Sequence, residues 1–151
     1  MKIFIASDHA GFNMKEILIK YLSELGNEVI DKGPFNIDLN DDYPDFISLV
    51  AGEVSKDENA KGIILGGSGQ GEAVVANRFP RVRASVYYGR ALDMIKTTRE
   101  HNDSNILSLG ARFLNDDETK EAVKLWLDTP FTNEERHVRR ISKIEIYPNV
   151  K

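Results

Sequence analysis

The 151-residue sequence contains no cysteine, which excludes disulfides, thiolate nucleophiles and thiolate metal sites. It also lacks an excess of positive charge: the formal net charge is −4, so a general nucleic-acid or acidic-membrane surface is not expected. No apolar run reaches the length of a membrane span, and the run at the start is too short for a signal-peptide core. We therefore expect a cytoplasmic protein that binds neither nucleic acid nor membrane.

Histidine is scarce as well, because only His9, His101 and His137 are present. They show neither HxxxH nor HExxH spacing, so we predict no metal site. A single histidine is more often structural than catalytic. However, His9 follows the first predicted strand and His101 lies just before the fifth, near the expected ligand site. For these two, a functional and a structural role are equal alternatives.

Short apolar runs alternate with segments of helical periodicity along the chain. The predicted strands are 2–6, 28–31, 61–65, 83–86 and 106–109. The predicted helices are 12–25, 46–55, 73–77, 89–99, 116–127 and 134–146, the last ending before Pro148. This alternation predicts one α/β domain over residues 1–151, in which a five-stranded parallel sheet of Rossmann-like or flavodoxin-like order lies between two helical layers.

In open parallel sheets, ligands bind outside the carboxyl ends of the strands. Asp8 and His9 follow the first predicted strand, the segment 66–71 follows the third, and 110–112 follows the fifth. These positions therefore predict a single ligand site.

The segment 66–71 reads GGSGQG, with four glycines in six residues. Such a loop can turn tightly and point successive amides at a phosphate or an oxyanion. It fits neither the Walker A nor the GxGxxG pattern, and a plain strand-to-helix turn is the alternative. Glu72 follows in the first helical turn. It is either a carboxylate placed favourably at a helix start or a general base beside the oxyanion.

Two arginines of the last predicted helix, Arg136 and Arg140, are four residues apart and share a face. Two guanidinium groups on one face can clamp a phosphate. A solvated basic helix face is the alternative.

Four motifs, in this order and spacing, identify a family resemblance. They are SDHAG, GGSGQGEAVVANR, REHNDSNILSLGAR, and TPF followed by RHVRRI. Over nearly its whole length, the chain resembles the ribose-5-phosphate isomerase B family, which also includes the subunits of galactose-6-phosphate isomerase. The resemblance implies a cofactor-free aldose-ketose isomerase of the pentose phosphate pathway, which interconverts ribose 5-phosphate and ribulose 5-phosphate. It also implies a homodimer or homotetramer with sites shared between subunits.

The resemblance also implies roles for individual residues. The implied substrate-binding residues are Asp8, His9, Gly67, Ser68, Gly69, Gln70, Gly71, Asn102, Arg112, Arg136 and Arg140. The implied catalytic residues are Glu72, His101 and Ser68. His101 would open the furanose ring as a general acid, the loop amides would bind the enediolate, and the arginines, among them those of helix 134–146, would bind phosphate.

One departure from the family's motif indicates which residue acts as the base. Many family members carry a cysteine in a motif that reads ICGTGIG, where this chain reads LGGSGQG with Gly66 at the cysteine position. A subgroup carries GGSGNGE instead and uses its glutamate. The chain resembles that subgroup, so Glu72 is the expected base.

Three alternatives stay open from the sequence. In the first, the substrate is another sugar phosphate, such as a hexose or tetrose phosphate of the galactose-6-phosphate type. In the second, the chain is a nucleotide- or flavin-binding module on a similar fold. In the third, it is a catalytically inactive regulatory relative.

Overall fold

The computed structural model describes residues 1–146 and contains a five-stranded sheet. Its strands are β1 (Lys2–Ser7), β2 (Glu28–Asp31), β3 (Lys61–Gly66), β4 (Ala84–Tyr87) and β5 (Ile106–Gly110). All neighbouring strands are parallel, in the order β2-β1-β3-β5-β4. The predicted fold class is confirmed, and each predicted strand is found with its ends shifted by at most one residue.

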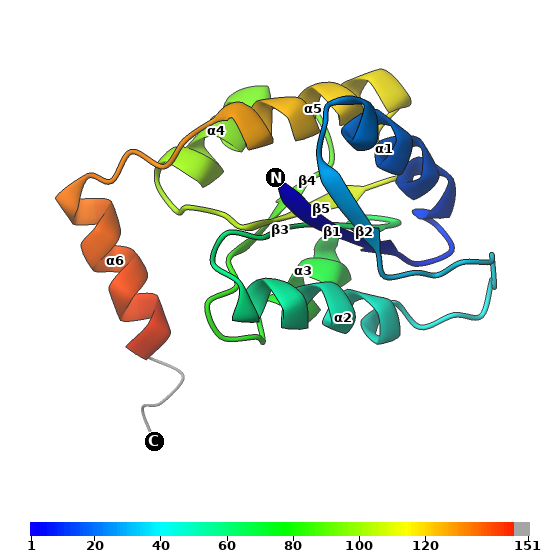
Figure 1. The fold of residues 1–151 in the computed structure, drawn as a ribbon, viewed down its shortest axis with the longest axis horizontal. Coiled ribbons are helices and arrows are strands. Elements are labelled where there is room, and N and C mark those ends of the chain that lie inside the picture. Colours follow the sequence, from blue (N-terminus) through cyan, green and yellow to red (C-terminus); the bar gives the residue numbers. More distant parts are fainter. Residues whose placement is uncertain (147–151) are drawn as a thin grey trace.

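Six helices connect or follow the strands. They are α1 (Phe12–Glu24), α2 (Tyr43–Lys56), α3 (Gln70–Ala76), α4 (Leu92–Glu100), α5 (Asp116–Asp128) and α6 (Glu135–Ile146). Helices α1, α4 and α5 cover one face of the sheet, and α2 and α3 cover the other (Figure 1). None of the helices in residues 1–146 has the length and apolarity that crossing a bilayer requires. Pro148, which the sequence suggested as the reason for the end of α6, lies outside the described residues.

The core has two parts because strand side chains alternate between the faces. In β1, Ile3 and Ile5 pack with the α1 and α5 side, whereas Phe4 and Ala6 pack with the α2 side. Trp126 of α5 is fully buried in the first part. Burial of such large apolar side chains contributes about 1.5–3 kcal/mol each, which fixes the sheet and hence the positions of its strand ends.

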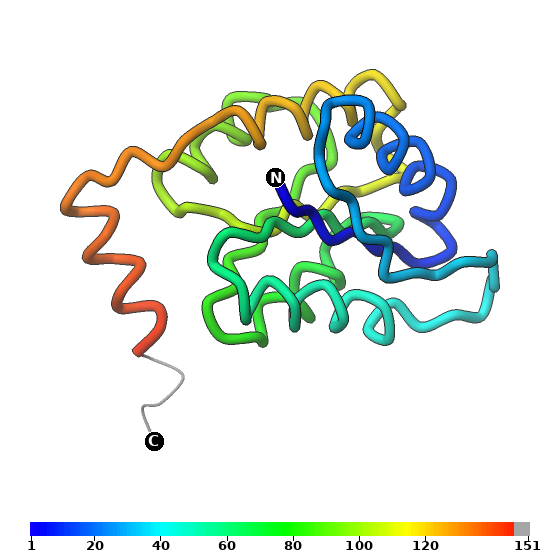
Figure 2. The backbone as a smooth tube through the Cα atoms, viewed as in Figure 1, coloured from blue at the N-terminus to red at the C-terminus, as the bar shows by residue number. Residues whose placement is uncertain are grey.

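Helix α6 is arranged differently from the other helices. The backbone trace leaves the end of α5 and carries α6 to one end of the sheet, away from both covering layers (Figure 2). Its described contacts are with residues that precede strands: Thr132, just before α6, donates to the carbonyl of Glu100, and the amide of Arg81 donates to Glu145. Because these partners lie ahead of β5 and β4, α6 lies at the amino edge of the sheet.

Candidate active site

Three strand ends meet at the carboxyl edge of the sheet. The amide of Asp8, after β1, donates to the carbonyl of Leu65 in β3 at 3.1 Å. The amides of Ala111 and Arg112, after β5, donate to the carbonyls of Gly66 and Gly67 at 2.8 and 3.1 Å. The predicted meeting of these segments is confirmed. It falls where the strand order reverses between β1 and β3, the usual ligand position in doubly wound sheets.

The loop between β3 and α3 is held open by its glycines and by one buried hydroxyl. Gly69 has a φ of +76°, a left-handed conformation that side chains disfavour. Ser108 of β5 donates to the Gly69 carbonyl at 2.6 Å and so fixes the turn. The amides of Gly67, Ser68 and Gly71 donate to no partner within residues 1–146, so they are available to an oxyanion.

Glu72 folds back from α3 over the end of β3 and is 4% exposed. A Cβ atom at Gly66 would overlap the Glu72 carboxylate, so the side chain of Glu72 occupies the space that a larger residue at position 66 would need. A cysteine at position 66 and Glu72 in this conformation therefore exclude each other. The absence of a side chain at Gly66 is what admits the carboxylate.

Burial raises the pKa of Glu72 above its ordinary value of 4.5, and the negative charge of Asp8 raises it further. Hydrogen bonding from the amides of Gly69 and Glu72 itself opposes this rise in pKa but does not cancel it. Desolvation therefore outweighs the stabilisation of the anion by these amides. A raised pKa makes the ionised carboxylate a better proton acceptor near neutral pH.

Two further side chains lie over the loop. The guanidinium group of exposed Arg112 lies 3.3 Å from where a Cβ atom of Gly67 would be, which places this predicted residue at the loop. The phenol of Tyr43, at the start of α2, lies 2.8 Å from the equivalent point at Gly71. Sequence reasoning missed Tyr43 and Ser108. Tyr43 follows an irregular loop that gives no periodic signal, and Ser108 looks like any small residue within a buried strand.

His9 is held by an acid from a distant loop. Its Nδ1 lies 2.6 Å from Oδ1 of Asp41, while Asp8 beside it accepts a hydrogen bond from the amide of Gly11. The chain thus brings Asp8, His9, Glu72, Arg112 and the 67–71 loop to one edge.

The remaining predicted residues lie at the opposite edge of the sheet. His101 ends α4 ahead of β5, and its ring stacks on that of His137 in α6, with centroids 4.3 Å apart and planes at 15°. The carbonyl of Asn102 accepts a hydrogen bond from Arg83, which precedes β4. The expectation that His101 lies near the carboxyl-end site of its own chain is therefore wrong, since a residue before a parallel strand sits at the amino edge.

Arg136 and Arg140 both lie on α6, four residues apart as predicted, and both are exposed. Arg136 pairs with Glu134 at 2.8 Å, and Arg140 forms no ion pair within the part of the chain that the structure describes. Figure 1 shows α6 and the loop 33–42 at opposite ends of the molecule. Asp41 of that loop contacts His9 at the carboxyl edge, where Glu72 also lies. One chain therefore does not bring these arginines to Glu72.

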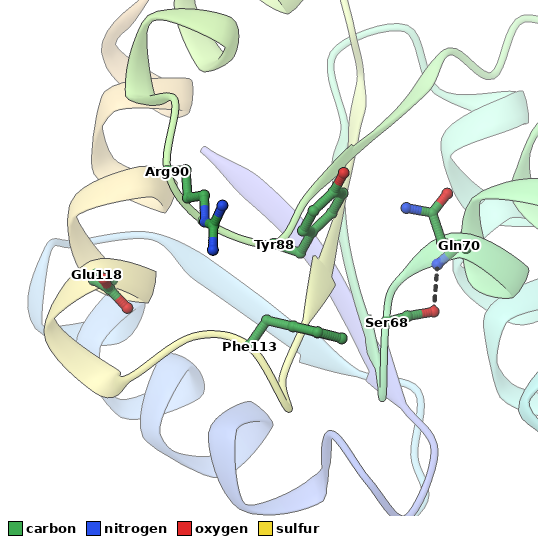
Figure 3. Close-up of a pocket in the computed structure, with 7 residues that line it drawn as sticks. Ser68, Gln70, Tyr88, Arg90, Phe113 and Glu118 are labelled. Atoms are coloured by element: carbon green, nitrogen blue, oxygen red, sulfur yellow. Dashed lines mark hydrogen bonds between the residues drawn. The ribbon is translucent and has the colours of Figure 1, made fainter.

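A cavity of about 680 Å³ opens beside the glycine loop (Figure 3). Ser68 and Gln70 form one wall, and the Tyr88–Phe113 aromatic pair, with ring centroids 6.0 Å apart, forms another. Neither Glu72 nor Asp8 lines it. The cavity therefore lies beside these two carboxylates, on the β4–β5 side of the sheet, and does not enclose them.

The fold and the carboxyl edge define a doubly wound α/β protein in which a glycine-rich loop with unpartnered amides lies beside a buried carboxylate, an arrangement suited to enolisation. The sequence model of the family described as Ribose/Galactose Isomerase matches residues 3–144, and the chain belongs to that family. The ribose-5-phosphate isomerase B of Mycolicibacterium paratuberculosis is 35% identical over 97% of this chain and 91% of its own length. The probable ribose-5-phosphate isomerase B of Mycoplasma genitalium is 39% identical, over 96% and 94%.

Solved structures agree over almost the whole chain. The crystal structure of ribose-5-phosphate isomerase B from Mycoplasma genitalium with bound ribulose-5-phosphate has a TM-score of 0.94 at 38% identity and covers 99% of this chain and 97% of that one. The Clostridium thermocellum enzyme has a TM-score of 0.92 at 40% identity, with coverage of 99% and 98%. The resemblance seen in the four motifs is therefore confirmed at the level of both sequence and fold.

Proposed function

We propose that this protein is an aldose-ketose isomerase that interconverts D-ribose 5-phosphate and D-ribulose 5-phosphate. The observation that carries the proposal is the buried Glu72 carboxylate beside the unpartnered amides of the 67–71 loop. Family membership and the bound ketose phosphate of the Mycoplasma genitalium structure support the substrate class. They also argue against the nucleotide- or flavin-binding alternative.

In the proposed mechanism, ionised Glu72 removes the proton from C2 of the open-chain aldose. The C2–H electron pair forms the C1=C2 double bond, and the carbonyl pair moves onto the C1 oxygen, giving a cis-enediolate. The amides of Gly67 and its neighbours donate to that oxygen, and each such donor lowers the barrier by ~3 kcal/mol. Protonated Glu72 returns its proton to C1 as the C2 carbonyl forms. Ser68 relays the hydroxyl proton between the two oxygens. No cofactor or metal enters these steps.

We further propose that a second copy completes each site, in a homodimer or homotetramer. His101, Asn102, Arg136 and Arg140 lie at the amino edge, whereas the buried Glu72 carboxylate lies at the carboxyl edge together with Arg112 and His9. The exposed arginines of α6 would bind the substrate phosphate bidentately across the interface. His101 of that copy would protonate the ring oxygen as its bond to C1 breaks, while the C1 hydroxyl loses its proton to water and becomes the aldehyde.

The family also contains galactose isomerases, so a hexose or tetrose phosphate is the second candidate substrate. The occurrence of Glu72, His101 and both arginines in one chain favours a self-sufficient homo-oligomer over a pair of different subunits. Rates on a panel of four-, five- and six-carbon aldose phosphates decide between the substrates. A cytoplasmic location stays a prediction from the sequence.

The direct test is isomerisation of ribose 5-phosphate in the presence of a chelator. We expect activity in wild type and a loss of about 100- to 10,000-fold in Glu72→Gln, because a positioned base contributes about that much. The matched control is Glu121→Gln, an exposed glutamate of α5, which should retain wild-type activity. Circular dichroism checks that both variants fold. Substantial residual activity in Glu72→Gln would rule out Glu72 as the base.

A further inference from the structure

The contact between His9 and Asp41 is the most specific side-chain pairing at the carboxyl edge that the proposed mechanism leaves unused. Asp41 ends the loop that connects β2 to α2, 32 residues from His9 in sequence, yet Nδ1 and Oδ1 are 2.6 Å apart. The Asp41 side chain is 5% exposed, and that of His9 is 25% exposed. The acid is therefore under the surface and the imidazole reaches outward from it.

We propose that Asp41 is a positioning residue that fixes the His9 ring by its Nδ1–H and keeps it a charged imidazolium, so that Nε2–H donates a hydrogen bond to a substrate oxygen. This inference rests on the proposed function in taking His9 as a substrate contact. Asp41 itself touches no substrate and acts only through His9.

The geometry supports a fixed ring orientation. With Nδ1 bound to Asp41, Nε2 lies on the other side of the ring, and it has no partner within residues 1–146. A histidine whose Nδ1–H is held by a carboxylate has a defined tautomer and direction, as in catalytic and metal-bound histidines. The contact with Asp41 therefore fixes the direction in which Nε2–H of His9 points.

The charges around His9 favour the imidazolium. The hydrogen bond to Asp41 is the main cause of a raised His9 pKa, and the negative charges of Asp8 and Asp41 add to it. Burial and the positive charge of Arg112 oppose the rise in pKa without reversing it. His9 therefore stays charged at pH values where an ordinary histidine is neutral, and Nε2 stays a donor there.

The pairing also explains the buried acid. Oδ2 of Asp41 has no hydrogen-bond partner among the described residues, so His9 is the partner that compensates its charge. Asp8, His9 and Asp41 also offer one ligand atom each within 4.8 Å of one another, the spacing of a cation site. His9 Nδ1 and Asp41 Oδ1 already bind each other, and Asp8 Oδ1 accepts a hydrogen bond from the Gly11 amide, so these groups have partners without an ion.

The test combines an NMR titration with kinetics. The variant is Asp41→Asn, which keeps the shape and an acceptor oxygen but removes the charge. The control is Asp42→Asn, which removes the same charge from the exposed neighbouring position, whose side chain makes no capping hydrogen bond. Among three histidines, the His9 signal is assigned from its loss in His9→Asn.

We expect the His9 pKa to fall in Asp41→Asn and to stay near the wild-type value in Asp42→Asn. The KM for ribose 5-phosphate should then rise about tenfold at a pH between the two measured His9 pKa values, where only the variant has lost the charged donor, with little change at a pH below both values, where both proteins carry it. The kcat should change little, and Asp41→Glu should recover part of the affinity at the higher pH. A general loss of structure would instead raise KM equally at both pH values.

An unchanged His9 pKa in Asp41→Asn, or a KM ratio between variant and wild type that is the same at both pH values, would overturn the proposal. A His9 pKa that shifts on adding a chelator to wild type would also overturn it, in favour of a bound cation. If wild type does not isomerise ribose 5-phosphate at all, the proposed function fails, whatever the titration shows. If wild type is active but Asp41→Asn has the same pH dependence of KM as wild type, only the proposed role of Asp41 fails.

Discussion

The carboxyl and amino edges of the sheet hold their functional groups in different ways. At the carboxyl edge, backbone turns and buried side chains fix the carboxylate and the loop: Glu72 fills the space beside Gly66, and Ser108 anchors Gly69. At the amino edge, Arg136 and Arg140 stand exposed on a helix that lies outside the two layers.

The histidines of the amino edge show a second contrast. His137 is 3% exposed, and burial together with the positive charge of neighbouring His101 lowers its pKa. A neutral His137 offers His101 a stacking surface without charge repulsion. The amino edge thus holds His101 and the arginines of α6, whereas the carboxyl edge holds Glu72 and the 67–71 loop. Each edge lacks what the other contains, which is the pattern expected if two copies form one site.

The largest expected effect tests the packing of the carboxyl edge. Gly66→Ala should lower kcat/KM by about 100-fold or more, because its Cβ must displace the Glu72 carboxylate and small displacements of a base are that costly. Gly52→Ala in α2 is the control, since its Cβ would meet only Phe79 at 3.8 Å. Steady-state kinetics and circular dichroism check both variants. An active Gly66→Ala enzyme would show that the Glu72 position is adaptable.

The next prediction tests whether the two edges act across subunits. Mixing inactive Glu72→Gln with inactive Arg140→Ala, after dissociation and reassembly, should restore activity to about a quarter of wild type, because half of a dimer population is mixed and has one intact site of two. Mixing Glu72→Gln with Gly66→Ala alters the same edge twice and should restore nothing. Equal activity in both mixtures would contradict the shared site.

A smaller effect should distinguish the acid of the amino edge from the base. His101→Asn should slow turnover of cyclic ribose 5-phosphate by about 100-fold, the lower end expected of a general acid, but should slow the ribulose direction less, because that ketose cannot close a furanose ring. The two directions are measured by coupled assays. Equal losses in both would argue against a role in ring opening.

The smallest effect is on stability. Because burial raises the pKa of Glu72 in the folded protein, its favourable contribution is fully present below the ordinary 4.5 and is lost as the pH rises through the raised value. This contribution is reduced at pH 7 because burial disfavours ionisation, so Glu72→Gln should raise the Tm at pH 7 by about 2–4 °C. The difference should shrink at pH 4. A higher Tm for wild type at pH 7 in thermal unfolding would show that hydrogen bonds outweigh burial.

Much of the carboxyl edge could be predicted from local pattern. Alternation of apolar runs fixed the strands, and the rule for parallel sheets then placed Asp8, the glycine loop and Arg112 together. The same rule places His101 at the other edge, since it precedes β5, and this signal was available from the sequence. Tyr43 and Asp41 could not be found in this way, because they reach the site from an irregular loop whose path depends on distant packing.

The sequence by itself determined the family, the order of strands and helices, and the presence of a carboxylate directly after a glycine-rich loop, because these depend on residue type and short spacing. Only the tertiary structure decided which edge each group occupies, that Glu72 fills the space left at Gly66, and that burial outweighs amide hydrogen bonding at its carboxylate. Those outcomes depend on solvent exclusion and on contacts between segments far apart in the chain, and no local pattern encodes either.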